Sequence, residues 1–398
     1  MNVFGIICEY NPFHNGHLYH ISKARALGAD AVICVMSGNY VQRGDFALFH
    51  KSARAEAAIR CGADAVIELP LPWAVSSAER FAAGGVSMLG SLGVITHICF
   101  GAEEDDCTKL LSAAELICSE SFQDKVSDEY RSGISFAAAR ERAVKKFSGE
   151  LAELFTKPNN ILAIEYIKAI KNQGLSIIPT AVARTGVSHD SATKSGSFAS
   201  ASLLREYIRD GKSVENYIPN EVLKILSEET SLGHAPVFSE YADKAMLACL
   251  KRFSADDFRK FCDVSEGLEF RLARAISESD TLESASLSAK TKRYALSRIR
   301  RIFLNAFLDI DGSIQTKTPP YARVLALNSR GRDVLRLASK KTIIPIITKP
   351  SSVKKLDVFS RSVFELERRA DDIYSLFMAN PIKQGSTYTR SPYFLDSI

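Results

Sequence analysis

Two histidines and a glycine stand close together in the stretch EYNPFHNGHLYH, residues 9–20. A strand-like apolar run precedes this stretch and a helix-like pattern follows it, so His14, Gly16 and His17 fall in a predicted strand-to-helix turn. The free N–H groups at a helix start bind phosphate, and glycine allows close approach of backbone to a ligand. Imidazoles there can donate to phosphate oxygens and, if protonated, oppose the charge on a leaving pyrophosphate. The turn therefore predicts a nucleotide site with catalytic His14 and His17.

No carboxylate stands beside the two histidines to act as a base partner. In-line attack on phosphorus needs mainly positioning and charge stabilisation, so such a partner is not required. The turn matches neither GxGxxG nor GxxxxGK[ST]. A zinc site from His14, His17 and His20 would want i, i+4 spacing and a fourth ligand, for which Glu9 is the only obvious choice. We predict no metal site, and a purely structural histidine pair remains the alternative.

A second phosphate-binding segment is predicted at SGSFASASLLREYI, residues 195–208. Ser197, Ser200 and Ser202 crowd the start of an amphipathic helix that carries Arg205. Small hydroxyl side chains at a helix start can bind phosphate, although a plain N-cap has the same pattern.

The elements that must position these residues alternate between strand and helix in the first half of the chain. Strand-like runs cover residues 3–10, 30–37, 64–70, 95–101 and 175–183, and helix-like stretches separate them. This alternation predicts right-handed βαβ units and a doubly wound parallel sheet in an α/β domain spanning 1–212. Ligands bind at the carboxyl ends of such strands. Residues 9–17, the loop 37–50, Gly101 and the pair Arg184–Thr185 should therefore converge.

The second half, residues 213–398, has mostly helical patterns, with short strand-like runs at 323–328 and 342–349. It predicts a largely helical domain with a small α/β appendage. Between residues 290 and 361 stand 17 lysines and arginines against four aspartates, although the whole chain carries only +5. A basic block in an otherwise acidic chain favours a polyanionic partner, and a solvated helix face is the alternative.

Composition limits the class of protein. The 398 residues are 46% hydrophobic and 24% charged, and no apolar run approaches the roughly 18 residues that span a bilayer. The eight cysteines form no CxxC pair, and the first residues lack the features of a signal peptide. We predict a cytoplasmic protein with reduced cysteines and no membrane partner.

HNGH followed late in the same domain by SFASASLLR resembles the HxGH nucleotidyltransferase superfamily, whose domains are of the HUP or Rossmann-like type. The chain is more closely similar to the tRNA(Met) cytidine acetate ligase family. That resemblance rests on GIICEYNPFHNGHLYH, MSGNYVQRGDFALFHKSARAEAAIRCGADAVIELP, FGAE, KPNNILAIEYIKA, VARTGVSHD, GSFASASLLR and YARVLALNSRGRDVL. Cys8 and Phe46 depart from the family pattern without removing a ligand.

The resemblance implies an enzyme that activates acetate with ATP to acetyl-AMP, releasing pyrophosphate. The acetyl group then passes to N4 of the wobble cytidine of elongator tRNA(Met), giving N4-acetylcytidine. Its expected partners are ATP, with Mg²⁺, acetate and tRNA(Met), and not DNA. Asn159 is the implied contact in KPNN, with Asn160 adjacent. The ATP-binding residues implied in this sequence are Ile6, Ile7, Glu9, Tyr10, Asn11, Pro12, Phe13, His14, Asn15, Gly16, His17, Leu18, Tyr19, Gly101, Asn159, Arg184 and Thr185.

Residue chemistry agrees with this activity. Acetate is already ionised at neutral pH, so its attack on the α-phosphorus needs no base. Cations must screen two anions, and beyond the histidines Arg184, Arg43 and Lys194 are available. We also expect the loop 38–50 to be a lid that excludes water.

Basic side chains should hold the tRNA. Those at 290–301, including Arg298, Arg300 and Arg301, and a second cluster at 330–341 are the expected contacts. A small-molecule adenylyltransferase explains the first half alone, and a non-catalytic RNA-binding protein is a third possibility.

Overall fold

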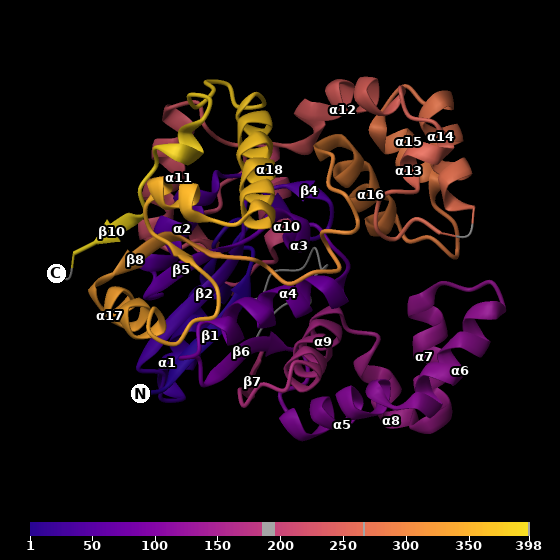
Figure 1. Ribbon diagram of the computed structural model, residues 1–398, viewed down its shortest axis with the longest axis horizontal. Coiled ribbons are helices and arrows are strands. Elements are labelled where there is room, and N and C mark those ends of the chain that lie inside the picture. Colours follow the sequence, from indigo (N-terminus) through magenta and orange to yellow (C-terminus); the bar gives the residue numbers. More distant parts are fainter. Residues whose placement is uncertain (185–195, 266, 397–398) are drawn as a thin grey trace.

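The computed structural model describes residues 1–184, 196–265 and 267–396. Its strands are β1 Val3–Cys8, β2 Ala31–Ser37, β3 Tyr40–Val41, β4 Asp45–Phe46, β5 Ala65–Leu69, β6 His97–Ala102, β7 Ile178–Ala183, β8 Ala322–Asn328, β9 Ile346–Ile347 and β10 Tyr393–Leu395. The main sheet has the order β10-β8-β5-β2-β1-β6-β7, with β9 beside β8 (Figure 1). The pairs β5–β2, β2–β1, β1–β6 and β6–β7 are all parallel, as the alternating pattern predicted.

Helices cover both faces of this sheet. The helices of the first half are α1 Asn15–Ala26, α2 Lys51–Arg60, α3 Leu71–Ala74, α4 Ala78–Ser91, α5 Cys107–Cys118, α6 Glu120–Arg131, α7 Phe136–Phe147, α8 Gly149–Leu154, α9 Pro158–Asn172 and α10 Ala201–Arg209. Alternate strand residues enter two separate cores: Phe4 and Ile6 pack with α1, α2 and α10, whereas Val3 packs with α4 and α9. The doubly wound architecture is therefore confirmed.

The chain changes direction of winding at β1, which lies between β2 and β6. At such a switch point the loops after neighbouring strands diverge to opposite faces and leave a crevice at the carboxyl end of the sheet. The HNGH turn begins directly after β1 and therefore opens onto that crevice.

The second half begins as predicted with helices. They are η1 Glu215–Tyr217, α11 Asn220–Ser231, η2 Ser239–Ala242, α12 Asp243–Leu250, α13 Ala255–Phe258, α14 Leu268–Glu278, α15 Leu282–Ala289, α16 Leu296–Leu308, α17 Ser329–Ala338, η3 Pro350–Lys355, α18 Val358–Ser375 and η4 Ser386–Tyr388. Helices α12 to α16 surround a core of their own, and α5 to α8 form another helical excursion between β6 and α9 (Figure 1).

The strands of the small α/β appendage predicted for the second half belong to the main sheet. β8 lies antiparallel to β5, and β10 and β9 pair with β8, so the end of the chain returns to the sheet of the first half. β8 is buried along six of its seven residues, and β5 is buried along its whole length. A buried strand needs backbone partners on both sides, and pairing with β8 covers the edge that β5 would otherwise expose. The division into 1–212 and 213–398 remains a functional proposal.

None of the helices in the described ranges combines the length and apolar character needed to cross a bilayer.

Candidate nucleotide site

The two histidines of HNGH form a capping box at the start of α1. His14 is the N-cap residue, and its Nδ1 accepts the backbone N–H of Gly16 at 3.0 Å. The Nδ1 atom of His17 accepts the backbone N–H of His14 at 3.2 Å. The two rings stack with centroids 3.7 Å apart and planes 24° apart. This reciprocal capping uses imidazoles where serine and glutamate are common.

The capping bonds determine which ring nitrogen carries a proton. An Nδ1 atom that accepts an N–H cannot itself be protonated, so each neutral ring carries its proton on Nε2. A doubly protonated ring would lose its capping bond. The geometry therefore favours two neutral Nε2–H donors over the imidazolium ions considered from the sequence. Side by side at a helix start, such donors suit the oxygens of a phosphate group.

Two aromatic residues of the same turn pack against the ring of His17. The ring centroids of Tyr10 and Phe13 lie 4.8 and 5.5 Å from that of His17, and both residues are about 1% exposed. Tyr10 has a positive φ of 49°, which is unusual for a residue with a side chain. These two side chains pack against His17, so contact of either residue with a nucleotide would involve backbone atoms.

Four residues predicted as nucleotide contacts also pack internally through their side chains. Ile6 and Ile7 lie within β1 and enter the cores on opposite sides of the sheet, while Leu18 and Tyr19 pack on the same core as Ile6. Contact with a nucleotide at Ile6 or Ile7 would have to involve backbone atoms.

Asparagine side chains and Arg205 join the turn to the serine-rich segment. Asn15 Nδ2 donates to the carbonyls of Ser197 at 3.0 Å and Asn216 at 3.1 Å. Arg205 Nη1 donates to the carbonyl of Asn11 at 3.1 Å. The Asn11–Pro12 peptide is cis. The structure therefore brings the two predicted phosphate-binding segments side by side.

The serine hydroxyls are partly occupied in this arrangement. Ser200 caps α10 by accepting from Leu203 N at 3.2 Å, and Ser202 Oγ accepts from Arg205 at 3.3 Å.

Gly101, Arg184 and Asn159 gather at the ends of β6, β7 and the start of α9. The side chain of Arg184 runs alongside Gly101, where a Cβ atom would lie 3.4 Å from Arg184 Cγ. Asn159 Nδ2 donates to Glu103 Oε1 at 2.6 Å. Burial lowers the pKa of Arg184, and the charge of Glu103 opposes that shift.

Asn160, the neighbour of Asn159, is buried and bonded to the backbone. Asn160 Oδ1 accepts the backbone N–H of Glu104 at 2.9 Å, and the residue is only 2% exposed. Thr185 and Lys194 lie outside the described residues.

Glu9 follows β1 and faces basic side chains. Its Oε1 accepts the backbone N–H of Gln42 at 2.8 Å. Burial raises the pKa of Glu9, and the cations Arg205, Arg43 and Arg54 act in the opposite direction. Glu9 is half-buried, lies near three arginines and bonds the backbone of Gln42, so it helps to fix the position of the turn.

The loop 38–50 is packed into the molecule and is not placed as a lid. Tyr40, Phe46, Leu48 and Phe49 are each at most 2% exposed. The Tyr40 hydroxyl donates to the carbonyl of Ala370 in α18 at 2.9 Å. We correct the prediction of a lid, because opening this loop would expose several buried aromatic side chains.

The basic residues of α16 are largely engaged within the protein. Arg298 donates to the carbonyl of Asp263, and Arg300 pairs with Glu283 at 2.6 Å. Arg301 is 9% exposed, and its backbone lies against Gly44. These three arginines are therefore less available to contact tRNA phosphates than the sequence predicted. Lys290 and Lys292, just before this helix, are exposed.

The second basic cluster lies near the amino ends of the parallel strands. Asn328, which precedes α17, donates its N–H to the carbonyl of Asp64 at 2.9 Å, and Asp64 stands just before β5. Since the parallel strands begin there, α17 lies away from the crevice at their carboxyl ends. The two basic clusters that were predicted to contact tRNA therefore lie at different ends of the strands.

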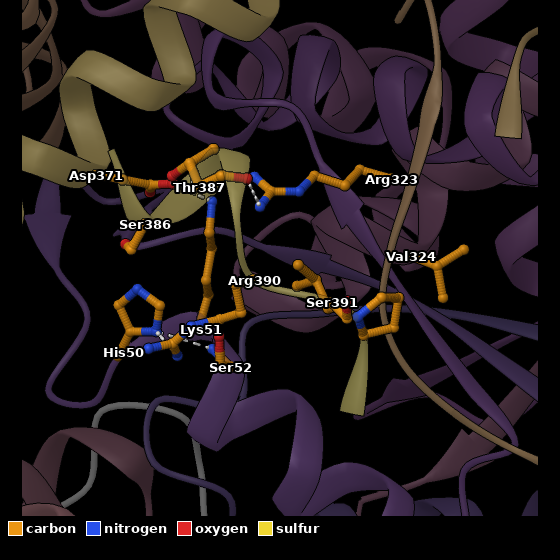
Figure 2. A pocket seen from close by; sticks show the side chains of 12 residues that line it. His50, Lys51, Ser52, Arg323, Val324, Asp371, Ser386, Thr387, Arg390 and Ser391 are labelled. Atoms are coloured by element: carbon orange, nitrogen blue, oxygen red, sulfur yellow. Dashed lines mark hydrogen bonds and ion pairs between the residues drawn. The ribbon is translucent and has the colours of Figure 1, made fainter. Parts of the chain in front are cut away.

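A cavity beside the start of α2 holds a buried ion cluster (Figure 2). Lys51 Nζ lies 2.6 Å from carboxylate oxygens of both Glu68 and Asp371, and Arg323 Nη1 lies 3.3 Å from Glu68. Burial holds the pKa of His50 well below its ordinary value. The cluster joins α2, β5, β8 and α18. Among the described residues no group of three histidine, cysteine or acidic side chains is arranged to hold a metal ion.

The chain matches the model of the family described as HIGH Nucleotidyl Transferase over residues 1–388. It is 38% identical to a tRNA(Met) cytidine acetate ligase of Acetivibrio thermocellus over 411 residues, which cover 98% of this chain and 99% of that protein. The chain belongs to the tRNA(Met) cytidine acetate ligase family.

Other members of the family agree. A Thermoanaerobacter protein of the same name is 40% identical over 389 residues, covering 96% of each chain. A crystal structure of Thermotoga maritima TmcAL bound with alpha-thio ATP has a TM-score of 0.93 to this chain at 33% identity, with full coverage of both. The apo form of that protein has a TM-score of 0.95.

Sequence reasoning missed several residues that shape the site. Glu103 anchors α9 and Asn216 receives Asn15. Arg54 donates to the backbone carbonyl of Glu9, although it lies in the middle of an alanine-rich helix. A lone arginine among alanines on a buried helix face was the available signal for Arg54.

Proposed function

We propose that this protein uses ATP to activate acetate as acetyl-AMP and transfers the acetyl group to N4 of the wobble cytidine of elongator tRNA(Met). One observation carries the first step. The stacked rings of His14 and His17, whose Nδ1 atoms cap the start of α1, stand at the switch point of a parallel sheet. Membership of the acetate ligase family supports the second step.

The first step is a displacement at phosphorus. A carboxylate oxygen of acetate forms a bond to the α-phosphorus of ATP, and the bond from that phosphorus to the bridging oxygen of pyrophosphate breaks. Charge grows on the phosphate oxygens, and His14 and His17 donate to them through Nε2. Arg184 and the backbone N–H groups at the start of α1 add positive potential.

In the second step the N4 amino group attacks the acyl carbon of acetyl-AMP. The bond from that carbon to the AMP oxygen breaks, AMP leaves with the electron pair, and N4 loses a proton. Acetyl-AMP is labile to water, so the enclosed turn, backed by Tyr10 and Phe13, favours transfer over hydrolysis.

The proposed ATP-binding residues are the turn and its surroundings. Asn159 is preferred to Asn160, because it is the more exposed of the two, at 7% against 2%, and Asn160 Oδ1 accepts the backbone N–H of Glu104. Mg²⁺ would enter with ATP and be held mainly by phosphate oxygens. The full proposed set is residues 6, 7, 9–19, 101, 159, 184 and 185.

The tRNA is proposed to approach the carboxyl edge of the sheet between the helical excursions. Arg293 of the segment before α16 lies over the ring of Tyr130 in α6 at 4.7 Å, so these excursions meet there. Lys290 and Lys292 are exposed beside that contact. We further propose that the enzyme works in the cytoplasm.

The test incubates the full-length protein with ATP, acetate and an elongator tRNA(Met) transcript, followed by mass spectrometry of the nucleosides. N4-acetylcytidine should appear only with all three substrates. Acetate-dependent exchange of pyrophosphate into ATP, measured without tRNA, should be present and should be lost in His17→Ala. Exchange that is independent of acetate, or nucleotide transfer to a small phosphorylated acceptor without tRNA, would instead support an adenylyltransferase.

A further inference from the structure

Arg54 is a buried cation whose hydrogen bonds to the described residues all go to backbone carbonyls. It is 2% exposed, and it donates to the carbonyls of Phe49 at 2.9 Å and Ser37 at 3.2 Å, and through shorter bonds to those of Glu9 and Gly38. In the described ranges of the chain it makes no ion pair with a carboxylate. Burying a charge with no carboxylate in direct contact is costly, so a core residue is an unusual place for it.

These four carbonyls belong to the segments that form the floor of the nucleotide site. Glu9 directly follows β1, and Ser37 and Gly38 lie at the end of β2. One guanidinium therefore ties the carboxyl ends of the two strands next to the switch point. The planar fork of arginine can reach several carbonyls at once, which an ammonium group cannot.

The backbone that Arg54 holds leads directly into the histidines. Tyr10 follows Glu9 with a φ of 49°, a conformation that a tyrosine adopts only when its surroundings impose it. Asn11 is fixed next, by Arg205 at its carbonyl and by the Leu48 N–H at its Oδ1. Residues 9–11 are thus restrained from three sides, and Arg54 supplies the first restraint.

We infer that Arg54 is a positioning residue for acetate activation: it sets the path of residues 9–14 and so the placement of the His14 and His17 donors, and it adds buried positive charge beneath a site that must hold two anions. This inference rests on the proposed function. Arg54 touches neither substrate in this assignment and acts through the backbone of the turn. The same charge acts on Glu9, whose pKa it helps to hold down against the effect of burial.

A matched control exists in the same core. Arg323 is 7% exposed and donates to Glu68 and to the carbonyl of Thr387, and neither residue belongs to the turn. Figure 2 shows Arg323 reaching toward the buried cluster around Lys51 and Asp371. A lysine at either position keeps the charge and removes the fork, so both variants should lose stability.

The experiment compares Arg54→Lys and Arg323→Lys in the full-length protein. It measures thermal midpoints and the kcat and KM of acetate-dependent ATP–pyrophosphate exchange. For R54K we expect kcat to fall about 10- to 100-fold, because a shift of about 1 Å in a positioned group has an effect of that size. The KM for ATP should change by less than about threefold, and R323K should keep kcat within about threefold of wild type despite its lower midpoint.

Hydrogen exchange gives a readout that does not depend on activity. The amides of residues 9–11, 13 and 14 should exchange faster in R54K than in wild type, and R323K should leave them unchanged. Equal loss of kcat in both variants, or an unchanged turn in R54K, would overturn the inference. Absence of acetate-dependent exchange in the wild-type protein would refute the proposed function instead, so the two failures are distinguishable.

Discussion

Gly16→Ala should separate folding from catalysis in this protein. Gly16 is the second residue of α1, and a Cβ atom there would lie 2.8 Å from His14 Cε1 and 3.0 Å from His14 Nδ1. Unstrained carbon contacts are about 3.5–4.0 Å, so the imidazole must move by roughly 0.5–1 Å. What requires glycine at this position is therefore the histidine beside it.

The effects on stability should nearly cancel. Replacing a helical glycine by alanine stabilises by about 0.5–1 kcal/mol. Weakening the bond from Gly16 N–H to His14 Nδ1 removes a capping interaction of about 1 kcal/mol. We expect the free energy of unfolding to change by less than about 1 kcal/mol.

Catalysis should change much more. A displacement of this size in a group that donates to the transition state lowers kcat by about 10- to 100-fold. The assay is acetate-dependent ATP–pyrophosphate exchange, with thermal unfolding measured on the same preparations. Gly149→Ala is the control, since Gly149 also begins a helix and a Cβ atom there meets nothing within 4 Å. Wild-type kcat in G16A would refute the assignment of His14 as a phosphate donor.

Three other predictions concern separate parts of the molecule. His17→Asn keeps an acceptor for the His14 N–H, so it should fold as wild type, whereas His17→Ala should lose about 1 kcal/mol of stability, measured by urea unfolding. Burial first and then the charge of Glu68 raise the pKa of Glu367 to about 8. The unfolded carboxyl ionises near pH 4.5, so wild-type stability should fall between about pH 5 and 8, and Glu367→Gln should remove that loss. Neutralising Lys290 and Lys292 together should weaken tRNA binding and lower the salt slope by about 1–2, whereas neutral variants of the α17 arginines should not.

Each of these predictions has an outcome that contradicts it. Equal stabilities for the two His17 variants would show that the capping bond contributes nothing. A Glu367→Gln protein whose stability still falls between pH 5 and 8 as in wild type would show that the loss comes from another group. Weaker tRNA binding after changes in α17 would place RNA at the edge of the sheet that carries the strand starts.

Local pattern was sufficient for much of the fold. The period of apolar residues and the glycines after helices identified β1, β2, β5, β6 and β7. They also indicated that these strands run parallel, because each βαβ unit is formed by neighbouring segments. The carboxyl ends of these strands then placed the HNGH turn, Gly101 and Arg184 together.

Long-range pairing was beyond the sequence pattern. β8 joins β5 across more than 250 residues, and Asn39 bonds Asp371 at a separation of 332 residues. Nothing in the local composition of residues 38–50 reveals that α18 will cover them, so the lid was a reasonable but wrong prediction. Because β8 runs antiparallel to its neighbour β5, it ends where the parallel strands begin. The basic residues of α17, which follows β8, therefore lie at the amino ends of those strands.

The sequence by itself determined the type of chemistry: a strand-to-helix turn with two histidines and a glycine, and a basic second half. The tertiary structure decided how that chemistry is arranged. It placed Arg54 beneath the turn, joined the turn to the serine-rich segment through Asn15 and Arg205, and assigned most arginines of α16 to internal contacts. The reason is that hydrogen-bond partners and burial come from segments far apart in the chain, whereas periodicity and spacing report only on neighbours.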